Sequence, residues 1–175
     1  SSLERLIALE HGVDPQSQQE QIREMDSCPD PYQVFQSLLL PLENVRQNPK
    51  YHPEGDALYH SMQVFMLARD EMPYDEEFLL AALLHDVGKA IDSDNHLAAG
   101  LESLDGFISE RTAWLIAHHM EAHKVHNRTI GARRRRRLAQ SPWFDELCIL
   151  GDCDRAGRVP GAQVDDLDAI LDYIE

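Results

Sequence analysis

The sequence predicts an all-α fold. Apolar residues recur at the 3.6-residue spacing of helices along most of the 175-residue chain, β-branched residues are few, and apolar–polar alternation is poor. A composition of 43% hydrophobic and 27% charged residues is typical of a folded chain rather than a disordered one. We expect a helical lead-in over residues 1–50 that packs on a core domain over residues 51–175.

The helical pattern is divided by prolines, glycines and capping residues. The predicted helices are, in order, 2–10, 16–26, 31–40, 56–71, 75–87, 94–107, 110–122, 130–139, 142–154 and 165–174. Pro31 stands at the favoured first helical position, and the segment 48–55 contains two prolines and a glycine that break the pattern. Pro73 ends one helix, Gly88 is typical of a helix C-terminus, and Ser109 is suited to cap the next helix.

Composition disfavours several classes of protein. Lys and Arg number 16 and Asp and Glu 31, and the resulting net charge of −15 disfavours a general binder of nucleic acid or of anionic membranes. The longest apolar run, 78–84, is far shorter than the roughly 20 residues that span a bilayer, and the opening residues predict no secretory signal. Cys28, Cys148 and Cys153 show no disulfide or metal-binding spacing, so we expect reduced thiols and a cytoplasmic protein.

Four predicted helices each direct a histidine or an aspartate toward the interior. His60 shares a helical stripe with Val64, and His85 shares one with Phe78. The helix over 110–122 carries two adjacent histidines that need separate consideration, and the helix over 142–154 ends in two aspartates. We therefore expect these four helices to bring imidazoles and carboxylates together in one core.

The adjacent histidines and the two aspartates are distinguished by their helical phase. His118 lies beside Trp114 on the inward arc of its helix, whereas His119 lies about 100° round at the flank. Asp154 continues the stripe of Leu150, and Asp152 points to the opposite side. The pattern thus favours His118 and Asp154 as the interior residues.

Their convergence predicts a metal site. A single interior histidine or aspartate is often an ordinary core or capping residue. Three histidines and two aspartates together are best satisfied by a cation, since a buried carboxylate is costly unless it is paired or metal-bound. Such ligands suit Fe, Mn, Ni, Co or Zn. His85-Asp86 is predicted in the last turn of its helix, where unpaired carbonyls favour a cation, and Lys89 is either a contact for an anionic substrate or a surface amine.

These residues resemble the HD superfamily of metal-dependent phosphohydrolases. The elements that carry the resemblance are His60, the stretch LHDVGKA over 84–90, the stretch HLAAG over 96–100, and Cys153-Asp154-Arg155. The stretch HPEGD over 52–56 and the later Gly157-Arg158 are similar to the HD domain of bacterial CCA-adding tRNA nucleotidyltransferases. The resemblance covers about residues 52–160 and implies an HD-domain helical bundle with an N-terminal helical extension. The 50 residues before it are too few for a nucleotidyltransferase domain, so we expect a free-standing HD domain.

The resemblance also implies a ligand set and one or two divalent transition-metal ions as cofactors. The implied ligands of a first metal are His60, His85, Asp86 and Asp154. Those added in a binuclear centre, which Asp86 would bridge, are His96 and His118. His119 stays open as the alternative to His118, and Asp152 as the alternative to Asp154.

The implied activity is hydrolysis of phosphomonoester or phosphodiester bonds by a metal-activated water, on a small and nucleotide-like substrate. Asp86 and Lys89 are expected to be catalytic, and Arg155 and Arg158 to contact the phosphate. His119 or His123 is a candidate proton carrier for the leaving group. Two other functions stay open, namely a di-iron oxygenase of the same fold and a regulatory binding module without catalysis.

One basic segment allows two interpretations. Arg133–Arg137 is an uninterrupted run of five arginines in the helix predicted over 130–139. The run either contacts RNA or collects phosphate, or it is an exposed helix face balanced by acidic residues such as Asp165, Asp166 and Asp168.

Overall fold

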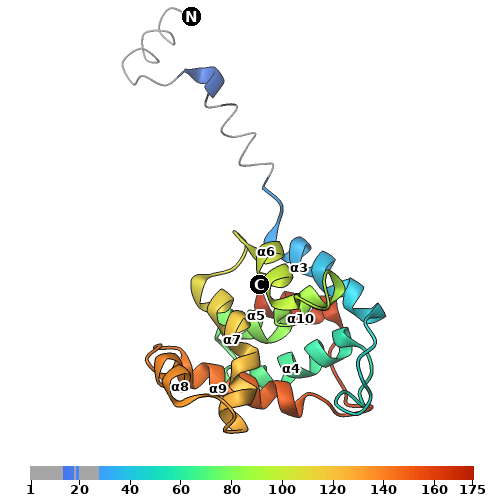
Figure 1. The fold of residues 1–175 in the computed structure, drawn as a ribbon. Helices are drawn as coiled ribbons and strands as arrows, with labels where there is room; N and C mark the ends of the chain where they lie inside the picture. The colour runs from blue at the N-terminus through green and yellow to red at the C-terminus, as the bar shows by residue number, and fades with distance from the viewer. Residues whose placement is uncertain (1–13, 18, 20–27) are drawn as a thin grey trace, which may run out of the picture. The chain divides into compact units, whose positions relative to one another are not determined.

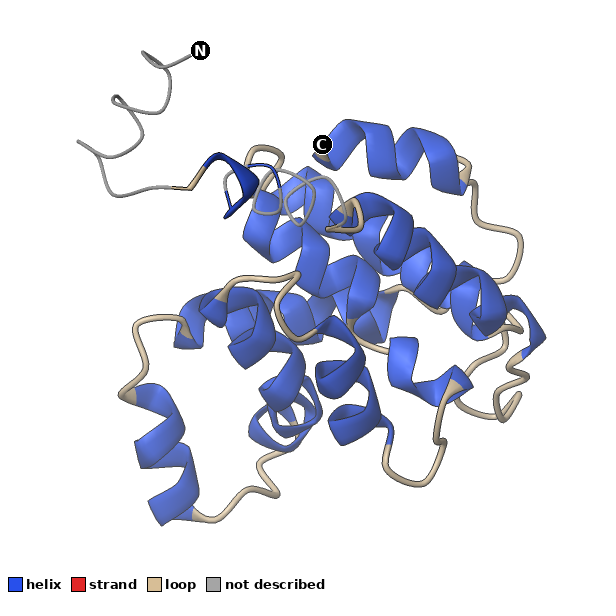
Figure 2. Cartoon of the chain, turned by 90° about the horizontal axis from the view of Figure 1, so that it is seen from above, coloured by secondary structure: helices blue, strands red, loops and turns tan. Residues whose placement is uncertain are grey.

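A computed structural model describes residues 14–17, 19 and 28–175 of the chain. It divides into two units, Ser1–Pro31 and Tyr32–Glu175, and the site described below lies wholly in the second. No strand is present among the described residues (Figure 2), which confirms the predicted all-α class. The helix predicted over 2–10 lies outside the described residues, and of 16–26 only residues 16, 17 and 19 are described, all helical.

The described helices follow one another closely from residue 31 onward (Figure 1). They are α3 (Pro31–Leu39), the 3₁₀ helix η1 (Leu40–Asn44), α4 (Ala57–Glu71), α5 (Glu76–Leu84), the 3₁₀ helix η2 (Val87–Ala90), α6 (His96–Leu104), α7 (Glu110–His126), α8 (Ala132–Ala139), α9 (Phe144–Ala156) and α10 (Leu167–Ile174). Asp56, Asp75, Ser109 and Asp166 act as N-caps, since each side chain accepts a hydrogen bond from the backbone N–H three residues later.

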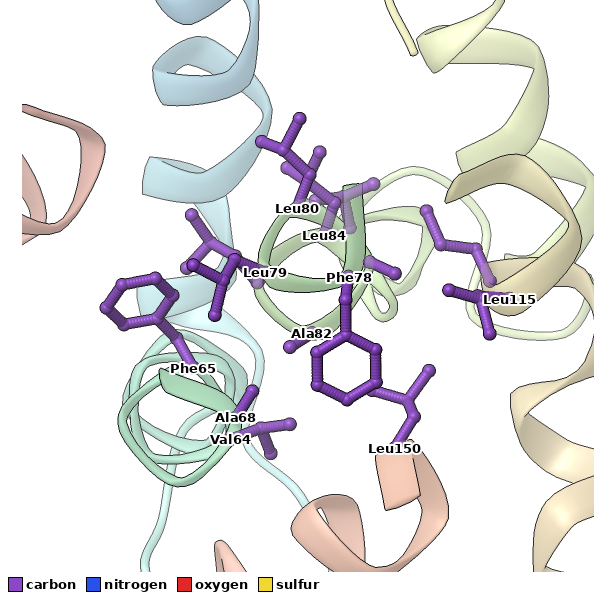
Figure 3. Close-up of a cluster of buried hydrophobic side chains, with 14 of the residues drawn as sticks. Val64, Phe65, Ala68, Phe78, Leu79, Leu80, Ala82, Leu84, Leu115 and Leu150 are labelled. Atoms are coloured by element: carbon purple, nitrogen blue, oxygen red, sulfur yellow. The ribbon is translucent and has the colours of Figure 1, made fainter. Parts of the chain in front are cut away.

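The central helix of this unit is α5, which is buried on all sides. Every residue from Phe78 to Leu84 is buried, which accounts for the long apolar run of the sequence. Figure 3 shows its side chains directed toward Phe65 of α4, Leu115 of α7 and Leu150 of α9. Because α4, α7 and α9 all pack against α5, polar side chains near its C-terminal end are brought together from every side.

Two helix ends differ from the sequence prediction. The helix predicted over 75–87 ends at Leu84, and His85 and Asp86 form the turn between α5 and η2 rather than its last turn. The helix predicted over 110–122 continues to His126, because the apolar series of α7 extends through Ala122 and Val125 into the core. Both differences change which side chains reach the site.

The core also includes part of the predicted lead-in. Phe35, Leu39 and Leu42 are buried within the unit Tyr32–Glu175. The periodicity of this segment predicted the helix, but it carries no signal that separates a lead-in from a core helix. Cys28, Cys148 and Cys153 are free thiols.

No helix among the described residues has the length and the apolar character needed to cross a bilayer.

Candidate metal centre

The site begins where α5 ends. His85 follows the last residue of α5 and its Nδ1 hydrogen-bonds the carbonyl of Ala82 at 2.8 Å. A carbonyl only accepts, so Nδ1 carries a proton and Nε2 is the nitrogen that can bind a metal. Nε2 lies 3.2 Å from Asp86 Oδ2 and 3.6 Å from Asp154 Oδ1, but it is buried without a hydrogen-bond partner. The nitrogen that is free to bind a metal therefore faces two carboxylates.

His60 is arranged in the same way from the other side. It lies in the first turns of α4, is completely buried, and its Nδ1 is 2.9 Å from the carbonyl oxygen of Gly157. Its Nε2 lies 2.8 Å from Asp154 Oδ1 and 3.9 Å from Asp86 Oδ2. The imidazoles of His60 and His85 are thus directed at the same pair of carboxylates, as their helical stripes predicted.

Asp154 is buried near the end of α9, in agreement with its position on the stripe of that helix. Its Oδ2 lies 2.7 Å from His123 Nε2, and His123 Nδ1 is 3.1 Å from the guanidinium of Arg155. Since a guanidinium only donates, Nδ1 accepts and Nε2–H donates to Asp154. Asp152, the alternative, is exposed and pairs with Arg155.

The structure corrects the choice between the adjacent histidines of α7. His119 is buried, its Nδ1 is 2.7 Å from the carbonyl oxygen of Ile116, and its Nε2 lies 3.6 Å from Asp86 Oδ1. His118 is partly exposed and pairs with Glu121 at 2.7 Å. The prediction that His118 faces the interior is wrong, because the buried stripe of α7 runs through Leu115 and Ile116 to His119.

His96 reaches the site through a close backbone contact. It is the first residue of α6, and its Nε2 is buried, has no hydrogen-bond partner and lies 3.9 Å from Asp86 Oδ1. Gly88 of η2 packs directly on α6, where an added Cβ would lie 1.8 Å from the carbonyl oxygen of His96 and 2.8 Å from the nitrogen of Gly100. Only glycine at position 88 allows η2 and α6 to approach this closely.

Asp86 lies between two groups of imidazoles. Its Oδ2 is directed at His85 and, more distantly, His60, whereas its Oδ1 is directed at His119 and His96. Lys89 Nζ also donates to Oδ2 at 2.9 Å, and to the side chain of Gln47 at 2.8 Å. One carboxylate thus separates two small clusters of imidazole nitrogens.

The charges of this interior are strongly coupled. Burial lowers the pKa of His85, but the carboxylates of Asp86 and Asp154 outweigh it and raise that pKa to about 10. Burial opposes ionisation of the two aspartates, yet the positive charge of His85 holds the pKa of each well below its usual range. Without a bound cation, His85 therefore stays protonated, and its positive charge balances the carboxylates of Asp86 and Asp154.

A metal ion fits these residues. The buried Nε2 atoms of His85 and His96 have no hydrogen-bond partner, and backbone carbonyls lie within hydrogen-bond distance of Nδ1 of His60, His85 and His119. A hydrogen bond from Nδ1 to a carbonyl orients the imidazole ring so that Nε2 faces a metal. The ligand atoms of His60, His85 and Asp154, and those of His85, Asp86 and His119, lie within 4.8 Å of one another.

The remaining site cations are held close to these ligands. Arg158 Nε donates to the backbone carbonyl of Asp154 at 3.3 Å, and its Nη1 donates to that of Tyr51 at 3.2 Å. Arg155 is engaged with His123 and Asp152. Lys89, Arg155 and Arg158 therefore surround the two carboxylates, and each is partly exposed.

Two residues take part in this site in ways that the sequence did not predict. The predicted helix ended at residue 122, so His123 was named only as a candidate proton carrier, although its position four residues after His119 was a usable signal that it reaches the ligands. Glu54 lies in the loop before α4, where no periodicity reveals burial, yet its side chain is 0% exposed beside His60. The HPEGD stretch was the available signal for Glu54.

Four helical elements and a buried cluster of histidines and aspartates define an all-α His/Asp protein of the kind that binds divalent metals. The HD domain family matches residues 57–157, which is more than half of the chain. The chain therefore belongs to the HD-domain family, whose members are mostly metal-dependent hydrolases. No curated protein matches the sequence.

Proposed function

We propose that this protein is a metal-dependent phosphohydrolase that cleaves phosphomonoester or phosphodiester bonds of a small, nucleotide-like substrate. The observation that supports the proposal most strongly is the position of Asp86, between two clusters of imidazole nitrogens and beside the ammonium group of Lys89. The family match and the fit of the cluster to a metal support the same reaction class.

The ligands divide between the two oxygens of Asp86. His60, His85 and Asp154 would hold one metal with Oδ2, and His96 and His119 would hold a second with Oδ1. A bound divalent metal would lower the pKa of a coordinated water and so supply hydroxide near neutral pH. In this proposal Asp86 would contribute to both metal sites, and His119 replaces His118 as the ligand from α7.

The partly exposed cations would bind the substrate. Lys89 Nζ has three protons, so it can turn from Gln47 to a phosphate oxygen while it stays close to Asp86. Arg158, whose guanidinium lies beside Asp154, would contact a second phosphate oxygen. The net charge of −15 of the whole chain favours a small substrate over a long polyanion.

His123 is placed to orient Asp154. Arg155 donates to its Nδ1, so the proton stays on Nε2 and is directed at Asp154 Oδ2. A neutral imidazole with its one proton engaged in this way is a poor general acid. In this proposal His123 therefore holds the Asp154 carboxylate in the orientation in which its other oxygen faces His60.

The test is a phosphatase panel on the purified protein, with Mn²⁺, Fe²⁺, Co²⁺, Ni²⁺ or Zn²⁺ added separately after chelation. We expect at least one metal to restore hydrolysis of a nucleotide or a small phosphoester, and Asp86→Ala to abolish it. Asp105→Ala, at an exposed position, serves as the control and should retain activity. Inactivity across the panel, or two bound irons with oxygen uptake and no hydrolysis, would contradict the proposal.

A further inference from the structure

Glu54 is a buried carboxylate behind the metal centre. It precedes α4 in a loop, and its side chain is 0% exposed. Gly55, with φ +117, adopts a conformation that favours glycine, and Asp56 then caps α4. The loop thus turns sharply between a buried acidic residue and the helix that carries His60.

The carboxylate is shared between two imidazoles. Glu54 Oε1 lies 2.9 Å from His52 Nδ1 and 3.0 Å from His60 Nδ1, and Oε2 is buried without a partner. Both imidazoles present Nδ1 to the same oxygen, so Oε1 is placed as the acceptor of two N–H donors. A buried carboxylate therefore stands on the side of His60 that faces away from Asp154.

His60 connects this charge to the site. Nδ1 lies near both Glu54 and the carbonyl of Gly157, whereas Nε2 faces Asp154. The Gly157 carbonyl can hold the Nδ1 proton but has no net charge. A carboxylate at the same nitrogen also makes the imidazole a stronger donor toward a cation on the opposite nitrogen.

We propose that Glu54 is a positioning residue of the metal centre, which fixes the Nδ1–H tautomer of His60 and strengthens its Nε2 as a ligand. The inference rests on the proposed function, because it assumes that Nε2 of His60 binds metal. His52 holds the carboxylate in place: its Nδ1 shares Oε1, and its ring packs edge-on against His60 with centroids 5.0 Å apart.

Glu54→Gln tests this role, since glutamine keeps the size and one acceptor oxygen but removes the charge. Co²⁺ affinity is measured by competition with a chelator, and the tautomer of His60 by ¹⁵N NMR of the metal-free protein. We expect the Kd for Co²⁺ to rise about 10- to 100-fold and the Nδ1–H population of His60 to fall. Glu43→Gln, at an exposed position, should change neither quantity.

The conservative variant Glu54→Asp keeps the charge at a greater distance, and we expect an intermediate Co²⁺ affinity. This variant also supplies the measurement if Glu54→Gln does not fold. Unchanged Co²⁺ affinity and an unchanged His60 tautomer in the variants would overturn the proposal.

Two other outcomes are distinct. His52, Glu54 and His60 have ligand atoms close enough to hold an ion themselves. Loss of one bound Co²⁺ per chain in Glu54→Gln, with the His60 tautomer unchanged, would identify such an ion site and overturn the positioning role. If the unmodified protein bound no Co²⁺, the proposed function would fail, whereas the tautomer measurement would still test the hold of Glu54 on His60.

Discussion

The interior of the site and the helix α8 hold charged residues under opposite conditions. His60, His85, Asp86 and Asp154 are 0%, 3%, 2% and 4% exposed, and every one faces an oppositely charged or hydrogen-bonding group. Arg133–Arg137 are all exposed, and within the described part of the chain only Arg134 of the five has an ion pair, with Glu121 at 2.8 Å. A buried charge is costly unless another charge compensates it, so the interior cluster of aspartates and histidines indicates a bound cation. The exposed arginines of α8 are solvated and need no such partner.

The acidic partners expected for the arginine run are engaged elsewhere. Asp165 pairs with Arg69, and Asp168 accepts a hydrogen bond from Gln36. The exposed-face interpretation of Arg133–Arg137 agrees with their exposure, but the balancing residue is Glu121 on the adjacent α7. An RNA contact stays an untested prediction.

The largest effect is expected from the two adjacent histidines of α7. His119→Ala removes a buried nitrogen that faces Asp86, and we expect Co²⁺ affinity to fall by at least about 100-fold. This loss is larger than that expected for Glu54→Gln, which removes only a partner of a ligand. His118→Ala, which removes only the pair with Glu121, should leave that affinity unchanged. Isothermal titration of Co²⁺ into both variants measures the difference. Equal losses of Co²⁺ affinity in the two variants would show that His119 does not differ from His118 as a metal ligand.

A second variant tests the backbone contact that brings His96 to the site. Gly88→Ala forces a Cβ against the His96 carbonyl, and we expect unfolding free energy to fall by at least about 2 kcal/mol. Urea denaturation followed by circular dichroism gives the value. Gly131→Ala is the matched control, because no heavy atom lies within 4 Å of its Cβ position and its φ is negative. Its cost should stay below about 1 kcal/mol.

The ion pair between Arg111 and Asp75 gives an intermediate effect that depends on pH. Two hydrogen bonds from Arg111, at 2.7 and 2.8 Å, hold the pKa of Asp75 below its usual range. This stabilisation is complete above the unfolded pKa of about 3.9 and is lost as pH falls through the folded pKa. We expect Arg111→Gln to cost about 1 kcal/mol at pH 7.

The loss of unfolding free energy caused by Arg111→Gln should shrink as pH falls below about 4. Asp75 is then protonated first in the unfolded state and, at its lower folded pKa, in the folded state as well. Urea denaturation at a series of pH values measures it, with Lys124→Gln at an exposed position as the control. A cost that stays constant down to pH 2 would show that the ion pair does not contribute.

The smallest effect is expected on α8. Replacing Arg135, Arg136 and Arg137 by Gln removes exposed charges, so unfolding free energy should change by less than about 0.5 kcal/mol and metal content should stay the same. Thermal denaturation and metal analysis measure these quantities. A large loss of either would show that the exposed arginines are part of the folded site.

Helical periodicity predicted most of the fold and the burial of three residues of the site. His60, His85 and Asp154 each lie on a stripe of apolar residues, and the structure buries all three. Periodicity failed at His118, because the partly buried Trp114 was assigned to the interior and shifted the phase by one residue. It also gave no information on Glu54, since a loop residue is buried by tertiary contacts that no local pattern records.

The central claim is that the buried histidines and aspartates hold a transition metal, and Asp154 and Asp152 test it as a matched pair on one helix. Metal analysis of the purified protein should find at least one transition-metal ion per chain. Asp154→Asn should lose it, because the variant replaces a buried carboxylate facing His60, whereas Asp152→Asn, with a side chain 71% exposed, should retain it. An unmodified protein that binds no transition metal, or equal metal content in both variants, would contradict the claim.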